Sequence, residues 1–306
     1  MPEWIAERGI GETRYARIDR GAIVEARIEL DGIVAAGTKV SATLVRTGRN
    51  GVARDEAGTE YLLPSGAPRI TEGSPVEIVV TRSAIPGIEP WKRPLAKLAG
   101  ADESEAAIKS VAGTMPADWD DLIEEARSGI VRFAGGELRL STTPAMTLID
   151  VDGTLPAREL AMAGARAAAR AILRLDIGGS IGIDLPTIAG KADRQAIGEA
   201  IDAILPKPFE RTAMNGFGFV QIVRPRRRAS LLELAADRAP FEARALLRRV
   251  GREPVGAKRL VAHPAITTVL EGNPAWLADL GRQIGGMVSL RADAALPMSG
   301  GYAEQV

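Results

Sequence analysis

Two apolar segments that end in aspartate, separated by one long helical pattern, constrain the fold of this chain most. The first reads LIDVDGT over residues 148–154, and the second reads SIGIDL over residues 180–185. Between them, residues 157–175 are rich in alanine and carry an apolar stripe at helical spacing, which predicts an amphipathic helix. A strand, a helix and a second strand in this order predict a layered α/β unit with parallel pairing.

The aspartates of these two strands are the candidate catalytic residues. If the strands pair in parallel, Asp150 and Asp184 stand at the same edge of the sheet, on strands about 4.8 Å apart. Carboxylate oxygens at such an edge suit Mg²⁺, or Mn²⁺, rather than zinc. We therefore expect Asp150 and Asp184 to hold the metal, with Asp152 as a third catalytic carboxylate. The alternative is that they are turn or cap residues, a common role for a single aspartate.

Composition narrows the chemistry that this chain can use. Among its 306 residues there is no cysteine and one histidine, His263, which excludes disulfides, thiolate chemistry and cysteine zinc sites. We expect His263, which precedes a proline, to have a turn or packing role. The chain has 39 basic and 39 acidic residues, so it does not hold nucleic acid by bulk charge.

The zero net charge hides a segregation along the chain. Residues 101–126 contain eight acidic residues and one lysine, whereas residues 224–259 contain eleven basic and four acidic residues. The two segments therefore carry net charges of −7 and +7. Either these are solvated helix faces, or they form an acidic hinge and a basic surface for a polyanion.

The pattern as a whole predicts a multidomain α+β or α/β protein. Short alternating runs separated by glycine turns predict strands at 13–19, 23–30, 39–45 and 76–82. In the middle, Gly178 and Gly179 are expected to end the central helix, before a further helix at 192–205 and a strand at 217–224. This continued alternation of strand and helix predicts that the strand at 217–224 is also parallel to its neighbour. No apolar run spans a membrane and no signal peptide is evident, so we expect a cytoplasmic protein.

Five regions follow from these patterns. They are an N-terminal strand pair joining the core (1–36), an OB-like module (37–97), an acidic connector (98–128), a central layered α/β domain (129–235) and a small C-terminal α/β subdomain (236–306).

The order of segments resembles the ribonuclease E/G family of bacterial endoribonucleases. The resemblance is carried by GGEL at 135–138, TLID at 147–150, LRLDIGGSIGID at 173–184 and FGFVQIVRPR at 217–226. More weakly, residues 12–30 look like the first strand pair of the family, and residues 37–97 like a shortened form of its RNA-binding OB module. The resemblance also implies that the central layered α/β domain (129–235) is the nuclease domain.

The resemblance implies a Mg²⁺-dependent endoribonuclease of RNA processing that cuts single-stranded RNA and leaves 5′-phosphate and 3′-hydroxyl ends. The two metal-binding aspartates of the family correspond to Asp150 and Asp184. Where the family usually has asparagine, this chain has Asp152, which adds negative charge beside an anionic substrate. The cysteines that link family members through zinc are absent, so a homo-oligomer would need another interface.

Six basic residues are candidates for binding RNA phosphates. Four follow the strand at 217–224, and two end the OB-like module: Arg224, Arg226, Arg227 and Arg228, then Lys92 and Arg93. Alternatively, the first four are simply solvent-exposed residues where the strand ends, without a role in binding.

Two other functions remain open. Asp152 and the shortened N-terminal half also suit an RNA-binding homologue whose cleavage is impaired. The sequence DVDGTL at 150–155 matches the nucleophile motif of haloacid-dehalogenase-type phosphatases, in which Asp150 is phosphorylated and Asp152 is the acid/base. That motif here lies far from the N-terminus, and no Gly-Asp dipeptide occurs in the chain.

Overall fold

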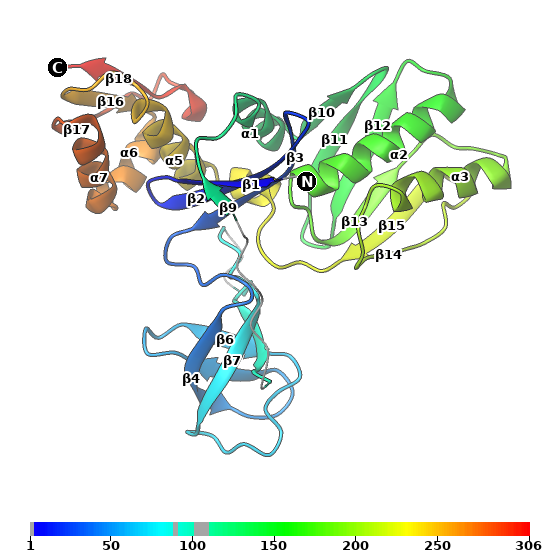
Figure 1. Ribbon diagram of the computed structural model, residues 1–306, viewed down its shortest axis with the longest axis horizontal. Coiled ribbons are helices and arrows are strands. Elements are labelled where there is room, and N and C mark those ends of the chain that lie inside the picture. Colours follow the sequence, from blue (N-terminus) through cyan, green and yellow to red (C-terminus); the bar gives the residue numbers. More distant parts are fainter. Residues whose placement is uncertain (1–2, 88–90, 101–109) are drawn as a thin grey trace.

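The computed structural model describes residues 3–87, 91–100 and 110–306, which form a mixed α/β protein with four sheets (Figure 1). The N-terminal sheet has the order β3-β2-β1-β9. Its strands are β1 (Glu3–Arg8), β2 (Glu12–Asp19), β3 (Ala22–Leu30) and β9 (Ser110–Ala112). The strands predicted at 13–19 and 23–30 are confirmed, and β1 and β9 extend the expected pair into a sheet.

The next part of the chain closes into a five-stranded barrel of order β4-β5-β6-β8-β7. Its strands are β4 (Lys39–Arg46), β5 (Gly51–Arg54), β6 (Glu60–Leu63), β7 (Pro75–Arg82) and β8 (Leu95–Leu98). Leu44, Tyr61 and Ile78 form the centre of a core that is separate from the rest of the protein. The barrel projects away from the other sheets in Figure 1.

A six-stranded sheet of order β10-β11-β12-β13-β15-β14 forms the centre of the molecule. Its strands are β10 (Ile130–Phe133), β11 (Gly136–Thr142), β12 (Thr147–Gly153), β13 (Gly179–Asp184), β14 (Glu210–Arg211) and β15 (Phe219–Arg224). As predicted, β12 and β13 pair in parallel through α2 (Ala157–Arg174). Helix α2 and the neighbouring α3 (Lys191–Asp202) cover one face of this sheet (Figure 1).

Parallel pairing does not continue beyond β13, so that part of the prediction is wrong. Strand β15 pairs antiparallel with β13, and Phe219 lies opposite Asp184. After α3 the chain returns to the end of the sheet where β13 starts, but there it forms the short β14, whose Glu210 lies opposite Val223. It then turns and runs back through the sheet as β15.

The end of α2 also differs from the expected glycine cap. The helix stops at Arg174, and Asp176 takes the left-handed conformation with φ 51°. Aspartate tolerates this conformation better than most residues do. Gly178 is needed for another reason, because a Cβ there would lie 2.9 Å from the Cα atom of Arg226.

The C-terminal part packs short helices around a three-stranded sheet of order β17-β16-β18. Its elements are α4 (Leu231–Ala236), α5 (Arg238–Val250), β16 (Lys258–Ala262), α6 (Pro264–Glu271), α7 (Pro274–Ile284), β17 (Val288–Ala292) and β18 (Tyr302–Gln305). His263 caps α6, because its Nδ1 accepts a hydrogen bond from the Ala265 N–H at 3.1 Å.

The main core joins the N-terminal sheet to the six-stranded sheet. Ala16, Ala26 and Ile28 belong to the same cluster as Ile149 and the buried face of α2. Helix α1 (Trp119–Ser128) contributes the fully buried Trp119 to it. Within the described ranges, no helix is long and apolar enough to cross a membrane.

Candidate catalytic site

Strand β12 sends alternate side chains to the two faces of the central sheet. Ile149 and Val151 are buried towards α2, where Gly164 of the helix approaches Val151 so closely that a Cβ would lie 2.3 Å from its Cγ1. The side chains of Asp150 and Asp152 point to the opposite face of the sheet and are exposed. The carboxylates therefore stand on the sheet face that α2 and α3 leave uncovered (Figure 1).

The two candidate metal ligands are direct neighbours across the parallel ladder. Asp150 of β12 is in register with Asp184 of β13, as the crossover predicted. Asp184 is the last residue of its strand, whereas β12 continues from Asp150 to Gly153. Paired residues of adjacent strands point to the same face, so both carboxylates share one surface.

Negative charge accumulates at this surface. Partial burial raises the pKa of the Asp150 carboxyl, and the charges of Asp152 and Asp184 raise it further. Arg139 of β11, which lies opposite Asp150, opposes this effect. Arg139 is also 3.9 Å from the Asp152 carboxylate and 2.8 Å from that of Glu137.

A divalent cation fits this donor set with two protein ligands. Within the described residues, no three His, Cys, Asp or Glu side chains come together as a metal site. Asp150 and Asp184 alone would hold the ion, and water and phosphate oxygens would complete its shell, as is common for Mg²⁺. The repulsion that raises the pKa of Asp150 is what such a cation relieves.

An apolar surface borders the carboxylates. Gly182 lies two residues before Asp184 on β13, and a Cβ there would be 2.5 Å from the ring of Phe219 and 3.0 Å from Leu148 Cδ2. The Phe219 ring therefore lies over the glycine. Phe217, just before β15, is 85% exposed.

The structure does not bring the predicted arginines to the aspartates. Arg224 pairs with Gly179, so it lies at the end of β13 opposite to Asp184. Arg226 forms an ion pair with Glu233, and Arg228 binds Asp176 at 2.8 Å. Arg224, Arg227 and Arg228 line a cavity of about 160 Å³ at that far end, together with Arg27 and Lys207.

The two basic candidates of the barrel region lie apart from this cavity. Arg93 binds Glu60 of β6 at 2.7 Å. Lys92 lines a cavity of about 430 Å³ that also contacts Trp91, Thr142 and Pro144. Thr142 is the last residue of β11 and pairs with Thr147, the first residue of β12, so this cavity reaches the end of these strands opposite to Asp152.

The acidic and basic segments of the sequence contact each other. Arg248 binds Asp120 of α1 at 2.6 Å, and Arg127 of α1 forms two hydrogen bonds to Glu242 at 2.7 and 2.8 Å. Part of the predicted basic surface is thus neutralised within the fold. Asp102, Glu103 and Glu105 of the acidic connector lie outside the described residues.

Sequence reasoning missed Arg139 and Glu137. Their signal was the alternation of GELRL at 136–140, which predicts a strand but does not reveal which strand it pairs with. Comparison with known proteins adds nothing to this site, since no protein-family model and no curated protein matches the chain.

Proposed function

We propose that this protein is a metal-dependent endoribonuclease that hydrolyses single-stranded RNA and leaves 5′-phosphate and 3′-hydroxyl ends. The observation that carries the proposal is the register of Asp150 with Asp184 on an open face of the sheet. The resemblance to the ribonuclease E/G family points independently to the same two aspartates. Ligands commonly bind at the carboxyl ends of strands in α/β sheets.

Asp150 and Asp184 would hold Mg²⁺, with Mn²⁺ as the alternative. Bound there, the ion supplies charge neutralisation for phosphate oxygens and makes a coordinated water more acidic. Asp152 accepts a hydrogen bond from the attacking water, in the position where the family has asparagine. Arg139, with a side chain that is 60% exposed, is placed to bind a phosphate oxygen beside the carboxylates.

The barrel supports RNA as the substrate. A closed five-stranded barrel is compatible with the OB-like module expected from residues 37–97, and such modules bind single strands in a groove. The exposed Trp91 and the neighbouring Lys92 lie between the barrel and β11. A base and a phosphate of one strand would contact these two side chains on the way to the carboxylates.

A homologue that binds RNA without cutting it is the second candidate. Asp152 favours it, since a third carboxylate beside Asp150 repels the phosphate that has to approach. The phosphatase alternative has less support. It requires Asp150 as a nucleophile at a strand end, whereas β12 continues to Gly153 in full pairing with β11.

Cleavage of labelled single-stranded RNA in Mg²⁺, Mn²⁺ or EDTA tests the proposal. We expect cleavage with metal, none in EDTA, and at least a ~100-fold loss of rate in Asp150→Asn and in Asp184→Asn. Asp193→Asn is the matched control, because Asp193 of α3 is paired with Arg158 on the helix side of the sheet.

Each contrary outcome has a distinct meaning. Wild-type protein that binds RNA but leaves it uncut with both metals would support the second candidate. Hydrolysis of a small phosphate ester that is lost in Asp150→Asn and kept in Asp184→Asn would support the phosphatase.

A further inference from the structure

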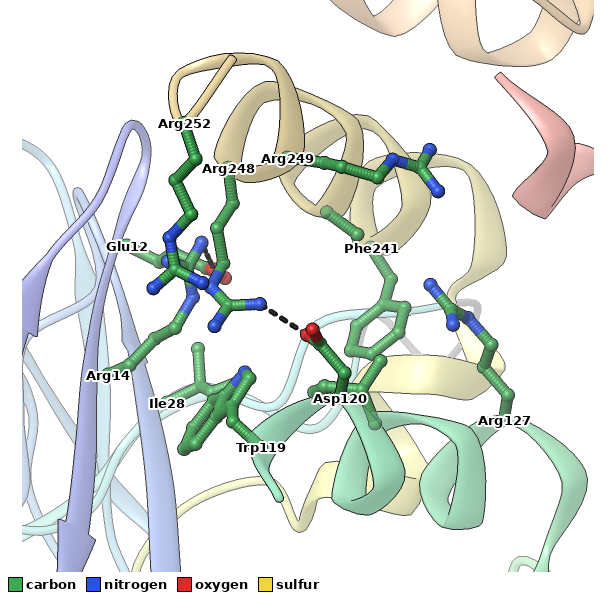
Figure 2. A pocket seen from close by; sticks show the side chains of 12 residues that line it. Glu12, Arg14, Ile28, Trp119, Asp120, Arg127, Phe241, Arg248, Arg249 and Arg252 are labelled. Carbon is green, nitrogen blue, oxygen red and sulfur yellow. Dashed lines mark hydrogen bonds and ion pairs between the residues drawn. The ribbon is translucent and has the colours of Figure 1, made fainter. Parts of the chain in front are cut away.

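A second hollow shares no residue with the carboxylate surface. It lies between the N-terminal sheet, α1 and α5, and has a volume of about 370 Å³ (Figure 2). Pockets of about 300–1,000 Å³ are the size that takes small molecules. Five arginines line it: Arg14, Arg127, Arg248, Arg249 and Arg252. We call it the arginine pocket.

Helix α5 shapes one wall of the arginine pocket. Phe241, Ala245, Arg248 and Arg252 follow one another at spacings of four, three and four residues, so they share one face of the helix and the turn after it. Ala245 is the small member of this row. Its short side chain leaves the space between Phe241 and the arginines.

Buried carboxylates fix one side of the pocket. Arg14, whose side chain is 3% exposed, binds Glu7 at 2.9 Å and is also paired with Glu12. Arg252 binds Glu7 at 2.7 Å, and Arg248 lies 3.4 Å from it. Burial alone would raise the pKa of Glu7, but the Met115 N–H and these three arginines keep it below its ordinary value. The guanidiniums are thus held in place.

In the lining itself arginines outnumber carboxylates, although Glu7, Glu124 and Glu242 also pair with these arginines from outside the lining. The lining contains five arginines but only two carboxylates, Glu12 and Asp120. Arg249 donates a hydrogen bond to the neutral Gly301 carbonyl at 2.6 Å. Asp120, the outer partner of Arg248, is 75% exposed, so an incoming anion can replace it at little cost. Guanidinium groups bind phosphate especially well because they donate two parallel hydrogen bonds.

The rest of the lining is apolar. Trp119 of α1 lies below Arg248 in Figure 2, and Phe241 of α5 lies below Arg249; Ile123 of α1 also lines the pocket. The guanidinium of Arg248 lies 5.9 Å from the Trp119 ring, and that of Arg127 lies 5.9 Å from the Phe241 ring. A ligand here would meet a cationic wall and an aromatic floor together.

We propose that the arginine pocket binds a small organic phosphate that carries an aromatic ring, of which a nucleoside monophosphate is the simplest representative. The phosphate lies against Arg248 and Arg252, and the ring packs on Phe241 and Ile123. The proposal is independent of the nuclease activity, since it uses none of the residues at the carboxylate surface.

Isothermal titration of the full chain with uridine and adenosine monophosphates, inorganic phosphate and the free nucleosides tests this inference. We expect at least one monophosphate to bind about tenfold more tightly than either phosphate or its nucleoside alone, because both halves of the pocket contribute. Ala245→Leu fills the pocket without changing its charge and should raise the Kd at least about tenfold. Arg252→Gln should weaken binding while the exposed residue leaves the fold intact.

Arg282→Gln is the matched control, since Arg282 of α7 is 74% exposed and pairs only with Asp279 among the described residues. Its Kd should equal that of the wild type. The inference fails if no monophosphate binds at millimolar concentration, or if inorganic phosphate binds as tightly as the nucleotides. It also fails if Ala245→Leu and Arg252→Gln both bind the monophosphate as tightly as the wild type does, when their thermal unfolding curves show that both variants are folded.

Discussion

At the scale of single residues, Asp150 combines the position of a proposed metal ligand with an unfavourable electrostatic environment. It is in register with Asp184 and two residues before Asp152, and the charges of both raise its pKa. Arg139 offsets part of this repulsion. Residues placed for function in this way commonly lower stability.

Asp150→Asn should therefore stabilise the protein, although under the proposed function it slows cleavage. The folded-state pKa of Asp150 is raised, so the ionised carboxyl costs stability above that pKa and nothing below the unfolded-state value. Because the site is exposed and screened, we expect a gain of only about 0.5 kcal/mol at pH 7. Thermal unfolding in EDTA at pH 7 and near pH 3 measures it, and the gain should vanish at the lower pH. A lower melting temperature at pH 7 would contradict the argument.

The sequence predicted that these aspartates are neighbours but not where the arginines lie relative to them, and the reason is physical. Apolar alternation around Asp150 and Asp184 shows which face each side chain takes. The same pattern carries no strand direction, so it did not show that β15 runs antiparallel to β13. Arg224 consequently lies at the wrong end of the sheet to assist Asp184.

At the scale of elements, the barrel contains one buried polar group whose titration reports on its stability. Tyr61 of β6 is fully buried, and its hydroxyl donates a hydrogen bond to Asp55 at 2.8 Å. Burial and the neighbouring Asp55 raise the pKa of Tyr61 to about 12. The neutral phenol is thus favoured in the folded barrel.

Alkaline pH should weaken the barrel through this residue. The folded-state pKa is above that of an unfolded tyrosine, about 10, so stability is lost as pH rises from 10 towards 12. We expect a loss of about 1.4 kcal/mol at pH 11 relative to pH 8. Urea unfolding of the wild type and of Tyr61→Phe, each at pH 8 and at pH 11, measures this loss of stability. If the variant loses as much stability as the wild type, Tyr61 is not responsible.

The long elements were predictable and the short ones were not. The stripe over 157–175 is long enough to identify α2, whereas α4 and α6 span only six and eight residues. Their signals were local: Ser230 with Glu233 forms a capping box at α4, and His263 with Pro264 begins α6.

At the scale of the whole molecule, a buried network of ion pairs joins the N-terminal sheet to helix α5. Glu12 of β2 is 3% exposed and pairs with Arg14 of its own strand and with Arg244 of α5, at 3.1 Å. Arg244 is itself buried. Residues more than two hundred positions apart are thus fixed against each other.

Removing Glu12 should destabilise the protein strongly. Glu12→Ala leaves Arg244 buried without a carboxylate, and breaking a buried pair in this way costs about 3 kcal/mol. Urea unfolding measures the loss. Glu304→Ala is the control, since its pairs with Arg259 and Arg291 are near the surface and are worth less than about 1 kcal/mol. If Glu12→Ala and Glu304→Ala lost the same free energy of unfolding, the buried network would not be the source of the stability.

The alternation within β12 also limits how this segment can change over evolutionary time. Core residues and carboxylates occupy alternate positions of one short strand, so gaining or losing a single residue before Asp150 would exchange the two sets. The carboxylates would then face α2, and Ile149 and Val151 would face water. Homologous strands can therefore diverge by substitution, but an insertion or deletion here would destroy the core and the candidate site in the same event.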